Sequence, residues 1–212
     1  MEIPNLNESL AEETGIHIGD GSMGIYKSGA LFSVAGHPID DKEYYEKHLK
    51  KLFKELYNID LRLRTWSRAY GFQICSKKLL NFKRKIGLPV GPKTWIRIPK
   101  WIKENRKFMA ACLRGIFDTD GTFYIEKKYG RPYPRIQISS ISSDLIKDIA
   151  LGLEKSEIKY GKWKEKPIRN WKARHVIAVR GYKSIEKWMG IIGTNNPKHI
   201  QKYKLSSLSV RK

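Results

Sequence analysis

The sequence is poor in cysteine and in acidic residues, and it contains no long apolar run. Its two cysteines, Cys75 and Cys112, are too few for a disulfide framework or a zinc site of their own, which indicates a reducing compartment. The apolar runs fall far short of the ~20 residues that span a bilayer. The segment Met1–Glu13 has four acids and no base, unlike a secretion signal. We therefore expect a soluble protein of the cytoplasm or an organellar matrix.

The charge balance indicates an acidic partner. The 212 residues include 42 Lys and Arg against 21 Asp and Glu, so the formal net charge is +21. Because 41% of the residues are hydrophobic, the chain can bury a core, which excludes a disordered chain. A folded protein of such charge repels itself, and this is typical of proteins that bind a polyanion. Six Trp, eleven Tyr and seven Phe favour a folded nucleic-acid binder over a basic tail.

A repeated motif divides the chain into two similar halves. The segment Gly15–Ser22 recurs as Gly115–Thr122, with Gly, Ile, Asp and Gly in register. A second pair of similar segments follows in the same order, 74–87 and 179–193, and each precedes a Pro-Lys pair. Two paired landmarks in one order indicate duplication. We predict halves at 1–98 and 106–212, joined by a linker at 99–105.

Each half predicts the same order of elements, α-β-β-α-β-β-α, from its hydrophobic periodicity and turn residues. A capping box at Ser9–Glu12 predicts the start of the first helix, which runs to about Gly19, and Asn105 can cap its counterpart. The other predicted elements are strands 23–26 and 31–35, helix 41–57, strands 61–66 and 69–75, strands 123–126 and 135–139, helix 143–153, strands 160–164 and 173–180, and a closing helix in each half. The predicted fold class is α+β, with two pseudo-symmetric halves.

Small residues recur four apart on both repeated helices. They are Ala11, Gly15 and Gly19 on the first helix and Ala111, Gly115 and Thr119 on the second. Glycine inside a helix costs about 1 kcal/mol relative to alanine, so we infer that the two helices approach each other closely along these faces. This packing would bring their C-terminal ends together. Those ends carry Asp20 and Asp120, each followed by a glycine suited to a left-handed C′ position.

Two carboxylates at converging helix C-termini predict a metal site. Each faces the negative end of a helix dipole, where cations are favoured, and the two repel each other. Divalent cations bound by the carboxylates and by backbone carbonyl oxygens would relieve both effects, and oxygen ligands suit Mg²⁺. Paired metal ions that activate water and stabilise a leaving oxygen are typical of phosphodiester hydrolysis.

At these residues the sequence resembles the LAGLIDADG family of homing endonucleases, in its two-motif, single-chain form. The resemblance covers most of the chain, namely both Asp-Gly helix ends, the segment from Gly36-His37 to Asp41-Lys42-Glu43-Tyr44, and Gly91-Pro92-Lys93 before Ile98-Pro99. It implies saddle-shaped antiparallel sheets that straddle DNA and a central interface between the two motif helices. It also implies double-stranded DNA with a long asymmetric target site as the substrate, and a monomer as the active form.

The resemblance further implies roles for individual residues. Asp20 and Asp120 would be the catalytic acids that bind two or three Mg²⁺ ions, with the carbonyls of Gly19 and Thr119 as further ligands. Lys93 and Lys198 would be the basic residues near the scissile phosphates. Gln137 would be the polar residue near the attacking water.

The two halves are not equivalent. The first motif departs from the family pattern at Thr14 and His17, where apolar residues are commoner, and Asp118 adds a carboxylate beside the second motif. Residues 1–100 have a net charge of +6, whereas residues 101–212 have +15. These differences predict unequal cleavage of the two half-sites and tighter DNA binding by the C-terminal half.

Basic residues interleaved with Trp along the predicted strands indicate a DNA-binding surface. Arg62, Arg64 and Arg68 surround Trp66, and a similar run surrounds Trp163 and Trp171. We expect strand alternation to place these side chains on one face that enters a DNA groove. The predicted DNA-binding residues are Tyr26, Lys27, Arg62, Arg64, Arg68, Gln73, Lys128, Arg131, Arg135, Lys162, Lys164, Arg174 and Arg180, and Arg169 belongs to the same basic run.

The prediction is therefore a Mg²⁺-dependent, site-specific, double-strand DNA endonuclease encoded within an intron or intein. The alternative is an RNA maturase or another non-cleaving binder, with host intron RNA as its partner. The segment Phe117–Thr122 also looks like the nucleophile loop of a haloacid-dehalogenase-type phosphatase. The order of the phosphatase motifs along this chain is wrong, however, and a net charge of +21 is unusual for an enzyme of small molecules.

Overall fold

Two four-stranded antiparallel sheets form the framework of the computed structural model, which describes residues 2–27, 29–128, 130–167 and 172–208. The first sheet has the strand order β1-β2-β4-β3 and the second has the order β5-β6-β8-β7. The two orders are the same once the strands of each half are numbered from its start. This equivalence confirms the α+β class and the layout in two pseudo-symmetric halves.

The first half contains one sheet with helices packed against it. Its elements are α1 (Glu8–Asp20), β1 (Gly21–Tyr26), β2 (Gly29–Gly36), α2 (Lys42–Tyr44), the π-helical turn η1 (Tyr45–Leu49), α3 (Lys50–Tyr57), β3 (Arg64–Trp66), β4 (Ala69–Cys75) and α4 (Lys77–Lys85). The segments α2, η1 and α3 follow one another without a break, so the predicted helix 41–57 exists but contains a π-turn. The strand predicted at 61–66 begins only at Arg64.

The second half repeats this order, with a short helix before it and a longer helix after it. Its elements are α5 (Lys100–Lys103), α6 (Arg106–Asp120), β5 (Gly121–Lys128), β6 (Arg131–Ser140), α7 (Ser143–Lys155), β7 (Gly161–Lys164), β8 (His175–Arg180), α8 (Tyr182–Ile191) and α9 (Pro197–Leu208). Helix α5 lies within the predicted linker. Helix α9 has no counterpart among the described residues of the first half, 2–27 and 29–98, and was not predicted. None of the helices in the part of the chain that the structure describes is both long and apolar enough to cross a membrane.

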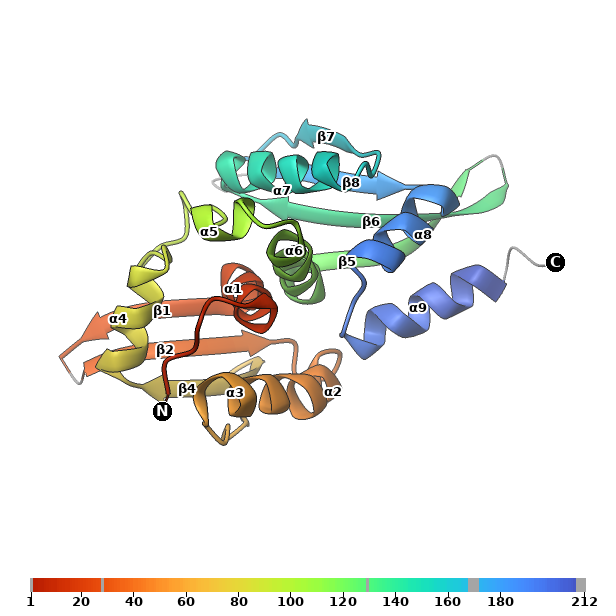
Figure 1. Cartoon of the computed structure of the whole chain (residues 1–212). Helices are drawn as coiled ribbons and strands as arrows, with labels where there is room; N and C mark the ends of the chain where they lie inside the picture. Colours follow the sequence, from red (N-terminus) through yellow and green to blue (C-terminus); the bar gives the residue numbers. More distant parts are fainter. Residues whose placement is uncertain (1, 28, 129, 168–171, 209–212) are drawn as a thin grey trace.

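The two motif helices lie side by side in the centre of the molecule, between the two sheets (Figure 1). A Cβ atom added to Gly15 would lie 2.1 Å from the Cys112 carbonyl oxygen, and one added to Gly115 would lie 2.2 Å from that of Glu12. Side chains at these positions would therefore collide with the backbone of the opposite helix. The predicted close approach of the two helices is confirmed.

The start of the first motif helix differs from the prediction. Its N-cap is Asn7, whose Oδ1 atom accepts a hydrogen bond from the backbone N–H of Leu10 at 2.8 Å. The predicted capping box at Ser9–Glu12 is wrong because the Glu12 carboxylate turns into the interface and binds Arg114 instead. The predicted cap of α6 is confirmed, since Asn105 Oδ1 accepts from the N–H groups of Lys107 and Phe108.

The glycines that follow the two aspartates serve close packing and not a left-handed cap. Gly21 and Gly121 have φ angles of −80° and −84° in the extended region, so the predicted C′ conformation is wrong. A Cβ atom on Gly21 would lie 2.5 Å from His17 Cα, and one on Gly121 would lie 2.3 Å from Phe117 Cδ2. Each strand therefore starts directly against the last helical turn, which places the aspartate at the junction of helix and strand.

Candidate active site and nucleic-acid interface

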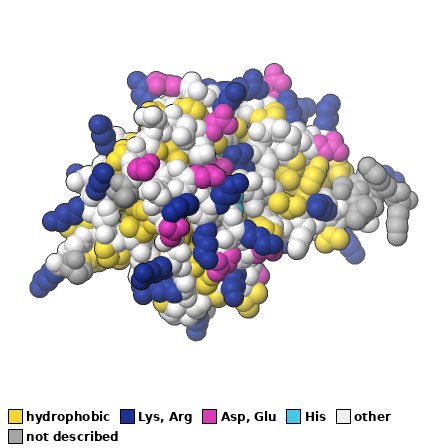
Figure 2. Space-filling model, turned by 60° about the horizontal axis from the view of Figure 1, so that its bottom comes forward, with side chains coloured by type: hydrophobic (Ala, Val, Ile, Leu, Met, Phe, Trp, Pro, Cys, Tyr) yellow, Lys and Arg dark blue, Asp and Glu magenta, His cyan; other side chains and the backbone are white. Residues whose placement is uncertain are grey.

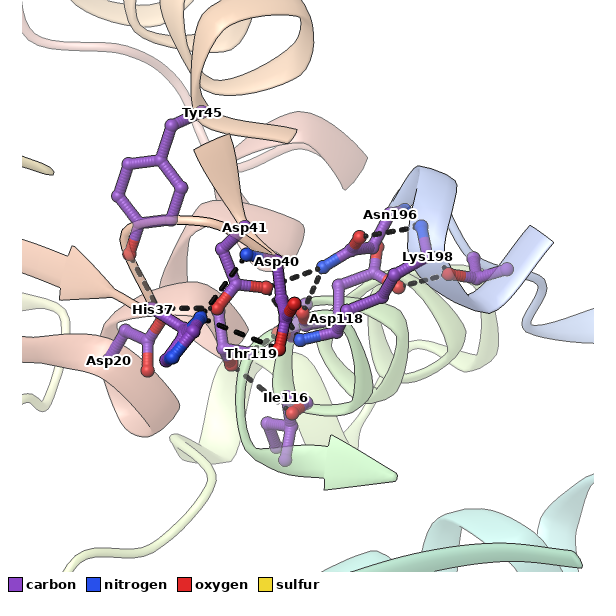
Figure 3. A network of polar contacts seen from close by, with 12 residues as sticks. Asp20, His37, Asp40, Asp41, Tyr45, Ile116, Asp118, Thr119, Asn196 and Lys198 are labelled. Carbon is purple, nitrogen blue, oxygen red and sulfur yellow. Dashed lines mark hydrogen bonds and ion pairs between the residues drawn. The ribbon is translucent and has the colours of Figure 1, made fainter. Parts of the chain in front are cut away.

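Asp20 and Asp120 are the last residues of α1 and α6, and the close packing of these helices brings them together. A Cβ atom on Gly19 would lie only 3.5 Å from Asp120 Cγ, so the second aspartate leans over the end of the first helix. Asp20 is half-buried, and its Oδ2 atom accepts a hydrogen bond from the Tyr45 hydroxyl at 2.9 Å (Figure 3). The predicted convergence of the two carboxylates is thus present in the structure.

The surroundings of both aspartates disfavour their charged forms. Loss of water raises the pKa of Asp20 to about 7, and the negative charge of Asp120 adds to the rise while the Tyr45 hydroxyl opposes it. Loss of water also raises the pKa of Asp120, against the opposing effect of Lys93 and Lys198. Two carboxylates that are costly to ionise together would be stabilised by a bound cation.

The donor atoms at the junction fit Mg²⁺. Among the described residues, no group of three or more His, Cys, Asp or Glu side chains is arranged to hold a metal ion. Two carboxylates, with backbone carbonyls and water or phosphate oxygens, nevertheless form the hard oxygen set that Mg²⁺ prefers, because this ion keeps several waters. Thr119 would contribute its backbone carbonyl oxygen, while its hydroxyl donates to the Gly115 carbonyl oxygen at 2.8 Å.

Lys93 and Lys198 both lie near the aspartates but are held differently. Lys93 Nζ donates to the carbonyl oxygens of Ile18, at 2.9 Å, and of Gly19. The predicted metal ligand at Gly19 is therefore shared with an ammonium group. Burial lowers the pKa of Lys93, and Asp120 and Asp20 oppose the decrease. Lys198, in the first turn of α9, donates to Asp41 Oδ1 at 2.5 Å.

The hydrogen-bond partners of Asp118 are structural, and its carboxylate does not face the other aspartates. Its carboxylate is fully buried and accepts hydrogen bonds from the Thr194 hydroxyl and, at 2.8 Å, from the backbone N–H of Asn195. Burial raises the pKa of Asp118 to about 7, and these two hydrogen bonds oppose the rise. The extra acid beside the second motif therefore anchors the segment before α9.

Sequence reasoning missed two groups beside the aspartates, Tyr45 and Asp41. Asp41 is 4% exposed and binds Lys198 and Asn196. Its signal was in the sequence, because it lies in the segment from Gly36 to Tyr44 that carries the family resemblance. Nothing in the spacing, however, connects Asp41 with a lysine near the end of the chain.

Gln137 lies on β6, opposite Thr122 of β5, one residue beyond the helix–strand junction. Its Oε1 atom accepts hydrogen bonds from Arg135, at 2.6 Å, and from the Tyr124 hydroxyl, at 3.3 Å. The amide N–H groups are therefore the part of Gln137 that can bind water or phosphate. The matching register position in the first sheet is Ser33, opposite Ser22.

One face of the second sheet gathers several of the predicted DNA-binding residues. The guanidinium carbons of Arg135 and Arg180 lie 5.1 and 5.2 Å from the Trp163 ring centre. Lys162 and Lys164 flank Trp163 on the same strand, so their side chains point to the opposite face. The prediction that all basic strand residues share one face is therefore wrong for these two lysines, because strand alternation separates them from the arginines.

The remaining predicted DNA-binding residues differ in their exposure and in the contacts they make. Arg135 is only 9% exposed and also binds Glu126, whereas Arg174, which lies just before β8, is exposed and binds Glu165 at 3.0 Å. In the first half, Arg64 donates to Gln73 Oε1 and lies over the Trp66 ring. The other predicted residues are exposed at strand ends and turns, and they are Tyr26, Lys27, Arg62, Arg68, Lys128 and Arg131. Arg169 and Trp171 lie outside the described residues.

Positive charge is widely distributed over the surface. On the face drawn in Figure 2, Lys and Arg side chains occur across the whole area, with fewer Asp and Glu between them. This distribution agrees with the net charge of +21. A broad positive surface suits a long polyanion better than a small acidic ligand.

Comparison with known proteins supports this assignment of the fold. Residues 107–193 match the family model of the LAGLIDADG-like domain. Among curated proteins, the chain is 25% identical over 169 residues to an uncharacterized protein of Methanocaldococcus jannaschii, covering 78% of this chain and 60% of that protein. It is also 28% identical over 189 residues to a glutamine–fructose-6-phosphate aminotransferase (isomerizing) of the same organism, covering 87% of this chain and 16% of that enzyme. The chain thus spans less than two thirds of each relative.

Solved structures of similar fold include LAGLIDADG proteins bound to DNA. The homing endonuclease I-DmoI in complex with DNA and Mn has a TM-score of 0.63 and 16% identity, covering 88% of this chain and 98% of that chain. The LAGLIDADG homing endonuclease I-GzeII in complex with its DNA target has a TM-score of 0.62 and 11% identity, covering 97% and 90%. The N-terminal LAGLIDADG domain of DUF199/WhiA has a TM-score of 0.57 and 14% identity, covering 91% and 86%. The chain accordingly contains a LAGLIDADG-like domain at residues 107–193 and, over its described length, has the two-half, single-chain fold of the LAGLIDADG homing endonucleases.

Proposed function

We propose that this protein is a site-specific double-strand DNA endonuclease that hydrolyses phosphodiester bonds with Mg²⁺ and acts as a monomer. The observation that carries the proposal is the pair of aspartates, Asp20 and Asp120, held together at the ends of two closely packed helices, each with a lysine nearby. Both acids come from one chain, so a single copy supplies the complete pair. The predicted origin within an intron or intein stays a prediction.

The chain's own groups would divide the work at the scissile phosphates. Asp20 and Asp120 would hold the divalent cations, which, when bound, supply an activated water and stabilise the leaving oxygen. Lys93 and Lys198 would offset the charge that develops on the phosphate in the transition state. Gln137 would orient water or a phosphate oxygen through its amide N–H groups, because its carbonyl oxygen already accepts from Arg135.

The sheets would hold the DNA. Exposed arginine and glutamine side chains lie on the face of each sheet away from its buried core residues, as Arg180 and Gln73 show. Side chains of these types bind phosphates and the edges of bases in the major groove. Structures of similar fold were obtained with target DNA and with Mn, Mg or Ca, which supports DNA as the substrate and a divalent metal as the cofactor.

Cleavage of a randomised duplex library, with and without Mg²⁺, tests the proposal. Sequencing of the cut ends should recover one long asymmetric site, and the Asp20→Asn variant should bind that site without cutting it. Lys93→Met should slow cleavage much more than it weakens binding, because its charge acts mainly in the transition state. Failure to cut any duplex, combined with tight binding of intron RNA, would instead identify a maturase.

A further inference from the structure

A polar network joins the two halves beside the candidate active site. We call it the cross-half network, and it consists of Asp41, Asp118, Thr194, Asn195, Asn196 and Lys198. Asp41 belongs to the first half and the other members belong to the second. Figure 3 shows Asp41 between the end of α1 on one side and the start of α9 on the other. The network therefore connects α2, α6 and α9 at the point where the two motif helices end.

Both oxygens of Asp41 are used. Oδ1 accepts from Lys198 Nζ at 2.5 Å and from Asn196 Nδ2 at 3.2 Å, and Oδ2 accepts from the backbone N–H of His37 at 2.8 Å. Asp41 is 4% exposed. A buried carboxylate with this number of donors has one orientation, so it fixes the direction of the lysine that binds it.

Asp41 also lies directly beside the candidate metal-binding acid of its own half. A Cβ atom on Gly36 would lie 2.9 Å from Asp41 Oδ2 and 3.0 Å from Asp20 Oδ2. The missing side chain at Gly36 thus leaves room for both carboxylates. Asp41 thus holds Lys198 near the aspartates, while its own carboxylate stays buried.

Residues of the second half also hold the first turn of α9 in place. Asn196 is fully buried, and its Nδ2 atom donates to the Asp118 carbonyl oxygen at 2.8 Å as well as to Asp41. Asp118 in turn holds the backbone N–H of Asn195. The first turn of α9, which carries Lys198, is therefore tied both to the end of α6 and to Asp41.

Lys93 is held by hydrogen bonds within its own half. Its ammonium group donates to the carbonyl oxygens at the end of α1, which belongs to its own half. A lysine side chain loses about 2 kcal/mol of rotamer freedom when it is fixed, so the group that fixes it affects how often it is correctly placed. The two lysines thus depend on different groups.

We propose that Asp41 is a positioning residue for Lys198. A carboxylate of the first half would then set the position of the ammonium group that the second half supplies. This inference rests on the proposed nuclease function for its kinetic consequence. Asp41 acts through Lys198 and does not touch the substrate. Loss of Asp41 should therefore impair cleavage of the DNA strand that Lys198 serves, and it should leave the strand served by Lys93 nearly unaffected.

Strand-resolved cleavage of an end-labelled target duplex tests this directly. Asp41→Asn should slow cleavage of one strand by tenfold or more, so that nicked product accumulates, while DNA affinity in Ca²⁺ stays within about twofold. The double variant Asp41→Asn/Lys198→Met should be no slower than Lys198→Met alone, and Asp41→Glu should restore part of the lost rate. Equal slowing of both strands, or additive losses in the double variant, would overturn the proposal.

Asp148 offers a matched control. It is also 4% exposed and also binds a lysine and a backbone N–H, those of Lys103 and Ile98, but it lies in the middle of α7 and not at the ends of the motif helices. Asp148→Asn should lower the melting temperature about as much as Asp41→Asn without any difference between the strands. If the Asp148 variant also cleaved the two DNA strands at different rates, general destabilisation would explain the difference, and the role of Asp41 would be refuted.

A second measurement separates this inference from the proposed function. Acylation of lysine amines by a small reagent, followed by mass spectrometry of the peptides, should show Lys198 labelled several-fold faster in Asp41→Asn and Lys93 unchanged. If the wild-type protein cuts no DNA, this result still supports the coupling of Asp41 to Lys198, while the proposed function fails. Unchanged labelling of Lys198 would overturn the coupling whether or not the protein cuts DNA.

Discussion

The two motif helices have the same backbone packing but different buried chemistry. On α1 the buried residues include Glu12, Glu13, Thr14 and His17, whereas the corresponding positions of α6 hold Cys112, Leu113, the half-buried Arg114 and Phe117. Glycines allow the close approach on both sides. The shape of the interface is therefore shared by the two halves, while α1 carries the buried carboxylates and α6 supplies Arg114 as the partner of Glu12.

The difference shows where polar groups are tolerated in this core. Glu13 binds Lys83 of α4, and both side chains are completely buried. Glu12 binds Arg114 of the opposite helix at 2.7 Å and His48 at 2.6 Å, and these partners lower its pKa to about 2 against the effect of burial. At the equivalent positions the second half buries apolar side chains. The packing geometry is shared by the two halves, whereas the second half places its buried carboxylate further along the helix, at Asp118.

The largest effect on activity is expected at the motif aspartates, which both halves share. Asp20→Asn and Asp120→Asn each remove a charge that would hold Mg²⁺, so either change should abolish double-strand cleavage. Sequence-specific binding should survive, because the groups expected to read DNA lie on the sheets. Supercoiled-plasmid cleavage and DNA affinity in Ca²⁺ are the measurements. Near-native cutting of both strands by both variants would mean that the reaction takes place elsewhere.

The shared packing predicts equal damage when the glycines are replaced. Gly15→Leu and Gly115→Leu would each drive a side chain into the opposite backbone, at a cost of about 3 kcal/mol or more. Urea unfolding should show a large loss of stability in both variants, whereas Gly190→Leu, where a Cβ atom meets nothing within 4 Å, should change little by collision. Unchanged unfolding midpoints in the two interface variants would contradict the close-helix interpretation.

These features differ in how well the sequence predicted them. The fold class, the order of elements and the convergence of Asp20 and Asp120 followed from the repeat and from glycines four apart. These are local sequence patterns, and each occurs in both halves. Helix α9, the Asn7 cap and the role of Asp41 did not follow. The last two depend on which of several adjacent polar groups finds a partner in three dimensions, and Asp41 and Lys198 are too far apart in the chain for spacing to connect them.

The prediction that the basic strand residues share one face failed for a related reason. The alternation rule is sound, but it requires the register, and Lys162 and Lys164 flank the residue that faces Arg135 and Arg180. Counting basic residues along a segment does not separate the two faces of a sheet. The predicted left-handed glycine at Gly21 was wrong because close packing explains the same residue.

The buried ion pair of the first half can be replaced by apolar residues, as at the equivalent position of the second half. Lys83→Met alone leaves Glu13 buried without its cation and should cost about 3–5 kcal/mol. Adding Glu13→Leu, which copies Leu113, should recover most of the loss, since a buried ion pair is often replaceable by apolar residues. Thermal and urea unfolding of the two single variants and the double variant form a cycle. A double variant that is no more stable than Lys83→Met would show that the ion pair is needed.

Salt dependence distinguishes the two faces of the second sheet. If Arg180 contacts a phosphate, Arg180→Gln should weaken DNA binding and reduce the log–log salt slope by about 0.9. Lys162→Gln removes the same charge from the opposite face and should leave the slope nearly unchanged. Binding is measured between about 50 and 200 mM salt, where such contacts have large effects. An equal change in slope for both variants would mean that the basic residues act only through net charge.

The smallest effect concerns the cost of ionising Asp20, which the Asp20→Asn variant isolates. The folded-state pKa of about 7 lies above the unfolded value, so the native protein loses stability as the pH rises through the interval between them. Asparagine does not ionise, and its Oδ1 atom can still accept from Tyr45. In the absence of divalent ions the melting temperature of Asp20→Asn should therefore equal that of the wild type near pH 4 and exceed it by a few degrees at pH 8. Mg²⁺ should narrow the gap at pH 8, because it stabilises only a protein that can bind it. A gap that is the same at both pH values would show that loss of charge at Asp20 is not its cause.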